Sequence, residues 1–145
     1  MKKLLRFALL PLIAAALHAA DDATRSQLMP VNNRWPIANV LSACRRYGDR
    51  TGRRVFIEYL LLEEINDSVA DAKRLAELLR DGRFHVNLIE YNATGGPYRG
   101  SPQERRRRFA EELERVAAGA GERDQAELGR AGELSGEERR GRIAG

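Results

Sequence analysis

The order of strand-like and helix-like runs is the feature that most constrains the fold of this chain. Three strand-like runs end in polar loops, at Ala14–Ala19, Ile57–Leu62 and Val86–Asn92. Helix-like segments follow the last two runs, so the sequence predicts β-loop-α units. Such units form parallel sheets, in which ligands bind at the carboxyl ends of the strands. We therefore expect an α/β fold with its functional residues just beyond the strands.

Apolar periodicity and proline positions predict the first helix and the second strand. Apolar residues recur at helical spacing from Ile37 to Tyr47, directly after Pro36. Glycines 48 and 52 predict the end of this helix. Arg54–Leu62 is a nearly continuous apolar run rich in strand-forming residues. A run of this kind predicts a strand that is covered on both faces.

Two capping signals predict the remaining helices. Ser68 and Asp71 have the spacing of a capping box, and Gly82 predicts the end of the helix that they open. The strand at Phe84–Tyr91 follows. Ser101–Glu104 has the same spacing, with proline in the first turn, and predicts a helix to about residue 117. The buried side of this last helix is expected to carry Phe109, Leu113 and Val116.

The two ends of the chain differ from its middle. Residues 1–16 combine early lysines with an apolar stretch and Ala14-Ala15-Ala16, which fits either a secretory signal or a segment that replaces a strand. Residues 17–118 are expected to form the folded unit. Residues 119–145 hold seven of the thirteen glycines and no aromatic residue, which predicts a flexible tail with at most short helical pieces at 124–129 or 136–142.

Composition limits the function without naming it. The net charge of +4 and the pI near 9.6 allow an anionic partner such as RNA, although a solvated Arg/Glu surface explains them equally well. No run reaches the roughly 20 apolar residues of a transmembrane helix. The single cysteine, Cys44, excludes an intramolecular disulfide and a cluster held by cysteines of this chain alone.

A few polar side chains are candidates for chemistry. His18 and Asn92 lie just after strand-like runs and are placed either to touch a ligand or to cap a loop. Glu58 and Asn87 lie within strands, where they are either satisfied by neighbouring strands or line a pocket. Cys44 falls on an apolar helix face and is predicted to be a core residue. His85, at a strand start, is predicted to be structural or exposed.

Two arginine clusters are weaker candidates. One is Arg105–Arg108, which winds around a helix; the other consists of Arg45, Arg46, Arg53 and Arg54. For both, a solvated surface is the first interpretation and contact with phosphates the second.

A series of ordered blocks follows the chain from its first strand-like run to its last loop. These blocks are Leu17–Asp22, Arg25-Ser26, Leu28–Asn32, Ala43–Tyr47, Thr51–Val55, Glu58-Tyr59, Asn66–Ser68, Asn87–Ile89, Tyr91-Asn92 and Pro97–Arg99. The series resembles a known family, the adenine-C2 RNA methyltransferases of the radical SAM superfamily. The resemblance covers about 100 residues with consistent spacing, so it is more specific than any single motif. It implies part of a radical SAM (βα) barrel, with two or three parallel strands, flanking helices and exposed sheet edges.

The resemblance also implies cofactors, partners and site residues. The family binds a 4Fe-4S cluster and S-adenosylmethionine (SAM), passes a methyl group through a protein cysteine, and acts on 23S rRNA and tRNA. Its Ser-Leu-His contact to SAM falls on Ala16, Leu17 and His18, and a later contact falls on Asn92. Because Ala16 stands where the family has serine, one hydroxyl hydrogen bond is lost. The choice between methylation at C2 and at C8 stays open.

Other parts of the family pattern do not occur in this sequence. Neither the CxxxCxxC motif that binds the cluster nor the methyl-carrying cysteine in its Ala-Cys-Gly-Gln-Leu context is present. We therefore expect a truncated C-terminal part of such a cytoplasmic enzyme, inactive alone, which an N-terminal half could complement. The alternatives are a non-catalytic RNA-binding or partner-binding remnant and, if residues 1–16 act as a signal, a small secreted protein.

Overall fold

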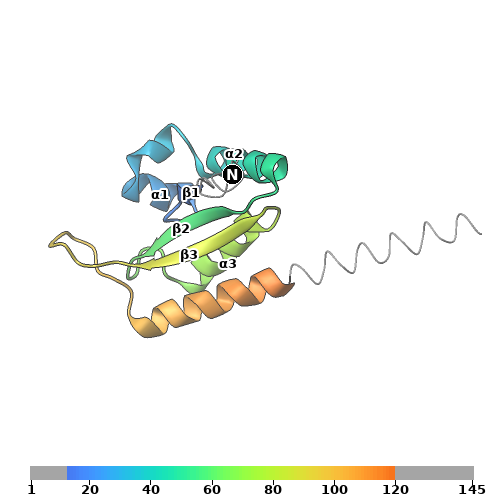
Figure 1. The fold of residues 1–145 in the computed structure, drawn as a ribbon. Helices are drawn as coiled ribbons and strands as arrows, with labels where there is room; N and C mark the ends of the chain where they lie inside the picture. Colours follow the sequence, from blue (N-terminus) through green and yellow to red (C-terminus); the bar gives the residue numbers. More distant parts are fainter. Residues whose placement is uncertain (1–12, 120–145) are drawn as a thin grey trace, which may run out of the picture.

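The computed structural model describes residues 13–119 (Figure 1). The signal-like stretch over 1–12 and the predicted flexible tail from residue 120 lie outside the described residues. Of the first segment, only residues 13–16 are therefore described, and they enter the sheet.

A parallel three-stranded sheet organises the described residues. Its strands are β1 (Ala14–Ala16), β2 (Val55–Leu61) and β3 (Phe84–Glu90), and they lie side by side in the order β1-β2-β3. Both pairings are parallel. The predicted α/β class and the parallel arrangement are confirmed, because each strand returns to the sheet through a helical crossover.

Helices fill the connections between the strands. They are α1 (Asp22–Leu28), the short 3-10 helix η1 (Pro30–Asn33), α2 (Ile37–Thr51), α3 (Val69–Leu79) and a last helix over 103–119. The sequence predicted the last three long helices, whereas α1 and η1 were not predicted. Figure 1 shows α2 above the strands, with α3 behind β3 and the last helix in orange below.

The core lies on one face of the sheet only. Along β2 the side chains alternate between buried and half-buried, with Val55, Ile57, Tyr59 and Leu61 buried. Their side chains pack with apolar residues of α2, α3 and Phe109 of the last helix. The expectation that this strand is covered on both faces is therefore wrong for the described residues. The other face holds the half-buried Phe56, Glu58 and Leu60, and no described helix crosses in front of it in Figure 1.

The helix ends confirm some of the capping predictions. Gly52 closes α2 with a positive φ of 69°, a conformation that suits glycine. Ser68 and Asp71 form the predicted capping box at the start of α3, with both reciprocal hydrogen bonds present.

Two local predictions are wrong. Helix α3 ends at Leu79, so Gly82 does not cap it; instead, a Cβ at Gly82 would overlap the ring of Phe84. No capping hydrogen bond joins Ser101 and Glu104 either: the Ser101 hydroxyl donates to the Asp67 carboxylate at 2.7 Å, and the Ser101 N–H donates to the Leu61 carbonyl oxygen at 3.4 Å. The role of Ser101 is thus determined by a tertiary contact, whereas that of Gly82 is determined by a side chain two residues along the chain.

No helix within residues 13–119 combines the length and the apolar character needed to span a bilayer.

Candidate functional site

His18 lies two residues beyond the end of β1 in an unusual backbone conformation. Its φ is +57°, in the left-handed region that is costly for residues other than glycine. Two hydrogen bonds hold it there: its Nδ1 accepts the N–H of Leu60 at 3.1 Å, and its carbonyl oxygen accepts the Asn66 side-chain amide at 2.8 Å. The histidine is therefore fixed against the neighbouring strand β2 and does not move freely with its loop.

The side chain of Asn66 is buried and forms hydrogen bonds to the backbone at the ends of both β1 and β2. Its amide nitrogen donates to the carbonyl oxygens of His18 at 2.8 Å and of Leu60 at 2.7 Å. Its side-chain oxygen accepts the N–H of Leu62 at 2.7 Å, and its own carbonyl accepts the hydroxyl of Tyr59 at 2.8 Å. Every polar group of the side chain is thus satisfied, as the burial of an amide requires.

Arg25 fixes the same loop from the other side. This arginine is only 3% exposed. Its guanidinium donates to the carbonyl oxygens of Ala16 at 3.2 Å, Leu17 at 3.1 Å and Trp35 at 2.9 Å, and to Oδ1 of Asn32 at 2.6 Å. Burial is the main cause that lowers its pKa, with Asp22 opposing the change. The planar guanidinium of arginine carries five N–H donors, so it can form hydrogen bonds to four acceptors at once.

One face of the sheet carries polar side chains close to the loop that contains His18. Ala16, Glu58 and Asn87 are register partners on adjacent strands and so point to the same face. The Asn87 amide donates to Oε2 of Glu58 at 3.0 Å, so these two polar side chains pair with each other. These two side chains and Ala16 therefore lie on the sheet face below the candidate site.

Asn92 lies two residues beyond the end of β3 and is exposed. Because the strands are parallel, His18 and Asn92 both lie at the carboxyl edge of the sheet, on its two outer strands. Two strand spacings, about 10 Å, separate these strands. The structure thus brings His18 and Asn92 to the same edge, where a ligand of several rings would span the distance.

The electrostatics of His18 favour a neutral ring. Burial is the main cause that lowers its pKa, and the charge of Arg25 lowers it further, while Glu58 acts in the opposite direction. Since Nδ1 accepts a hydrogen bond, the proton of the neutral ring is on Nε2. This leaves one N–H available as a donor toward the edge of the sheet.

The remaining candidates lie elsewhere. Leu17 is fully buried in the core, so its side chain does not reach a ligand. Its packing fixes the position of the adjacent His18. Cys44 is buried on the core side of α2, and burial raises the pKa of its thiol. His85 is exposed at the start of β3, where its ring meets that of Phe56 edge-on at 5.0 Å. The core assignment of Cys44 and the exposure of His85 were both predicted.

The arginines at 105–108 are paired with acidic groups. Arg105 bonds to the buried Asp67 at 2.6 Å, and Arg106 bonds to Glu90 at 2.6 Å. Arg107 and Arg108 bond to Glu104 on their own helix. The first interpretation of this cluster, a solvated and internally paired surface, is the one that the contacts support.

Sequence reasoning missed the residues that hold the site together. Apart from the family resemblance, the sequence predicts no role for Asn66, Arg25 or Asn32. No periodic pattern marks such residues, because their partners are backbone carbonyls of other elements. The only signal was their presence in the blocks that carry the family resemblance.

Metal ligands are not gathered in the part of the chain that the structure describes. Within residues 13–119 no group of three or more histidine, cysteine, aspartate or glutamate side chains is placed to hold a metal ion. The single cysteine, Cys44, lies on α2 on the covered side of the sheet. A 4Fe-4S cluster needs cysteine thiolates, so the residues present do not fit one.

Comparison with known proteins identifies relatives. The chain is 49% identical over 104 residues to a "probable dual-specificity RNA methyltransferase RlmN" of Heliobacterium modesticaldum, a match that covers 71% of the chain. It is 50% identical over 102 residues to the dual-specificity RNA methyltransferase RlmN of Anaeromyxobacter, covering 70% of the chain. This part of the chain is homologous to the RlmN methyltransferases. It spans about a quarter of their length, 27% in both cases.

Solved structures agree with this relationship. A radical SAM methyltransferase from Sphaerobacter thermophilus superimposes with a TM-score of 0.72 at 44% identity, covering 77% of this chain and 33% of that protein. A domain of a pyruvate-formate lyase-activating enzyme from Bacteroides vulgatus shares the fold alone, with a TM-score of 0.55 at 19% identity over 71% of this chain and 61% of that domain. No family model matches the chain. The predicted family and the radical SAM type of fold are confirmed by the similarity to RlmN and to the first structure.

Proposed function

We propose that this chain supplies the SAM-contacting edge of a radical SAM RNA methyltransferase of the RlmN type. The observation that carries the proposal is the fixed position of His18, which Asn66 and Arg25 hold at the carboxyl edge of the sheet. Ligands of open parallel sheets bind at this edge. The proposed SAM site consists of Ala16, Leu17, His18 and Asn92, in which the buried Leu17 positions its neighbours rather than contacting the ligand with its side chain.

The residues present fit part of a SAM molecule. Nε2 of His18 offers a donor, and Asn92 offers both a donor and an acceptor for ribose hydroxyls or ring nitrogens. The carboxylate of Glu58 lies on the same face of the sheet, where its negative charge favours a cationic ligand. When bound, SAM supplies the methyl group. The residues of this chain bind and orient SAM. Leu17 fills the core beneath the site and so excludes water there.

The finer activity is also part of the proposal. The relatives are named as dual-specificity RNA methyltransferases, so we infer adenine C2 of 23S rRNA and of tRNA as the substrates, in the cytoplasm. Residues 17–118 would act as one structural unit. The cluster ligands and the methyl-carrying cysteine do not occur in this sequence, so we expect no methyl transfer by the chain alone; a chain that carries them would have to complete the site.

Nuclear magnetic resonance provides the test of SAM binding, because the chain has only two histidines. Titration with SAM should shift the ring signals of His18 and the side-chain amide of Asn92. His85 provides the internal reference, since it is exposed at the opposite end of the sheet. The variant His18→Ala should lose the shifts at Asn92, and the matched variant His85→Ala should keep them.

Unchanged signals of His18 and Asn92 at millimolar SAM would refute the proposed SAM site. The expected inactivity is checked separately by iron analysis after anaerobic reconstitution of the chain. Stoichiometric cluster iron would contradict it.

A further inference from the structure

The sides of α2 differ in what covers them within residues 13–119. Its core side, which includes Leu41 and Cys44, is buried against the sheet. The next side carries Arg45, which donates to carbonyl oxygens at the end of α3. Val40 and Tyr47 point away from Arg45 by the helical spacing, and both are half-buried at the margin of the core. The side of α2 that faces away from α3 therefore presents apolar residues.

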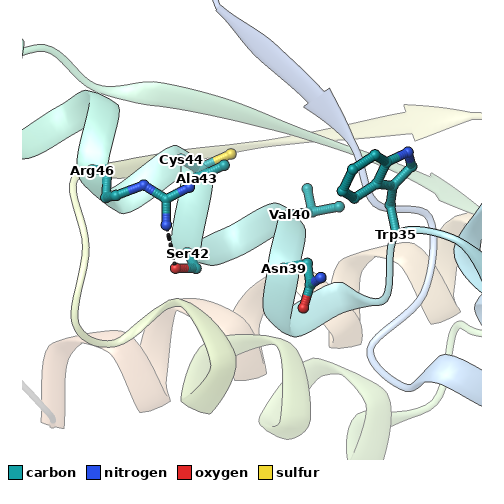
Figure 2. Close-up of a pocket in the computed structure, with 7 residues that line it drawn as sticks. All are labelled: Trp35, Asn39, Val40, Ser42, Ala43, Cys44 and Arg46. Atoms are coloured by element: carbon teal, nitrogen blue, oxygen red, sulfur yellow. Dashed lines mark hydrogen bonds between the residues drawn. The ribbon is translucent and has the colours of Figure 1, made fainter.

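A groove follows this side of α2. One hollow of about 540 Å³ extends past Trp35, Val40 and Arg46 (Figure 2). A second hollow of about 410 Å³ continues it past Tyr47 and Thr51. The two hollows share Ala43 and Arg46 among their lining residues, so they form one continuous groove, which we name the α2 groove.

The α2 groove offers an apolar surface between polar ends. Trp35 is 51% exposed, which is unusual for so large an apolar side chain. Figure 2 shows Trp35 and Arg46 at opposite ends of the first hollow, with Val40 between them. Apolar side chains gathered in a groove in this way indicate a surface that another segment or molecule covers.

The described chain begins beside the Thr51 end of this groove. Helix α2 leads into β2, so its last turn lies at the amino ends of the parallel strands. Ile13 precedes β1 at the same end of the sheet, where its carbonyl oxygen accepts the N–H of Phe56 at 2.9 Å. Its side chain packs against the margin of the core, as those of Val40 and Tyr47 do. Residues 1–12 are therefore joined to the sheet next to the groove.

The sequence of residues 1–12 suits an apolar groove of this length. Seven of the nine residues from 4 to 12 are apolar: Leu4, Leu5, Phe7, Ala8, Leu9, Leu10 and Leu12. Helix α2 has 15 residues and is about 22 Å long. Twelve residues span about 18 Å as a helix and about 40 Å when extended, so the segment can follow the groove in either form. Pro11 is a residue type that favours the turn needed to reverse the chain before β1.

We propose that residues 1–12 of this chain fold back over the α2 groove. Their leucines cover Val40, Ala43 and Tyr47, and the first residues of the chain lie near Trp35. Lys2 and Lys3 then lie at the end of the groove furthest from Arg50. The inference goes beyond the proposed SAM site and does not depend on it.

The other end of the chain is the alternative occupant. Residues 120–138 contain six acidic residues and two arginines, a net charge of −4 that would be attracted to Arg46 and Arg50. Exposed ion pairs contribute little, whereas the burial of several leucines contributes much more. Residues 120–138 contain only two leucines, and they follow the last helix, which α3 separates from α2. Apolar burial and proximity therefore both select residues 1–12.

Fluorescence provides a local test, because Trp35 is the only tryptophan of the chain. In the full chain the covered ring should emit at short wavelength and resist quenching by acrylamide. Deletion of residues 2–12 should move the emission to longer wavelength and increase the quenching several-fold. A synthetic peptide of residues 1–12, added to the deleted chain, should reverse both changes in a saturable manner. Circular dichroism confirms that the deleted chain keeps its helices.

Paired substitutions then identify the segment. Leu5→Ser/Leu9→Ser should reproduce the effect of the deletion on Trp35, because it removes two apolar side chains that cover the groove. The matched control is Leu128→Ser/Leu134→Ser, which makes the same change near the other end of the chain. This control should leave the emission and the quenching of Trp35 as they are in the unmodified chain.

Four results would overturn the proposal. The first is the same Trp35 emission and quenching in the full and the deleted chain. The second is an equal effect of the two leucine pairs, which would indicate the other end of the chain as the occupant. The third is a Trp35 signal that depends on protein concentration, which would indicate a second copy. The fourth is recovery of the chain from its cell with Leu17 as its first residue, which would identify the segment as a cleaved signal. SAM binding is read at His18, so either proposal can fail without the other.

Discussion

Replacement of Arg25 by methionine should destabilise the chain strongly, although it removes no carboxylate contact. The guanidinium makes four hydrogen bonds, to three backbone carbonyls and to Asn32. Hydrogen bonds to charged groups are worth about 1.5–3 kcal/mol each, so the gross loss is about 6 kcal/mol or more. Relief from burying a charge and entry of water offset part of it. We expect a net loss of about 3–5 kcal/mol for Arg25→Met.

Urea unfolding followed by circular dichroism measures this loss. With a slope of about 2 kcal/mol per molar urea, the midpoint should fall by about 2 M. Arg25→Lys keeps the charge but cannot reach four acceptors. Its urea midpoint should therefore lie between those of the unmodified chain and Arg25→Met. Arg107→Gln is the control for the loss of an arginine; it is exposed and should leave the midpoint within error.

The reasoning would be refuted if Arg25→Met shifted the midpoint no more than the control does. It would also be refuted if lysine restored full stability, because charge alone, rather than the fork geometry, would then hold the loop. If the methionine variant does not fold, Asn32→Ala removes one acceptor and gives a smaller shift that can be measured.

Three further predictions follow from other contacts. Ser68→Ala should cost about 1 kcal/mol in the same urea assay, because it removes the capping box of α3; a midpoint equal to that of the unmodified chain would contradict this. Cys44 should react with a thiol reagent at pH 8 far more slowly in the folded chain than in urea, because burial raises the pKa of its thiol; equal rates would be inconsistent with its packing. Stability should fall as the pH drops below about 6.5, the ordinary histidine pKa, because burial and then Arg25 lower the pKa of His18 and the folded state binds its proton more weakly than the unfolded chain. His18→Gln should reduce this pH dependence and His85→Gln should not; the opposite ranking would show that another group causes it.

The regular elements could be predicted from the sequence because their causes are local. Helical spacing after Pro36, the capping box at Ser68 and the apolar run Arg54–Leu62 each place an element within a few residues. The alternation of strand and helix determined the parallel sheet. The sequence also indicated the family, because ordered blocks over about 100 residues are visible without a structure.

Only the tertiary structure decided which residues support the site. Arg25 and Asn66 act on carbonyl oxygens of other elements, and Ser101 gives its hydroxyl to Asp67 rather than to its own helix. A sequence pattern records what each residue is, but these roles depend on which backbone groups the fold brings near. The same holds for the arginines: composition showed many of them, and only the contacts separated those that pair with carboxylates from those that do not.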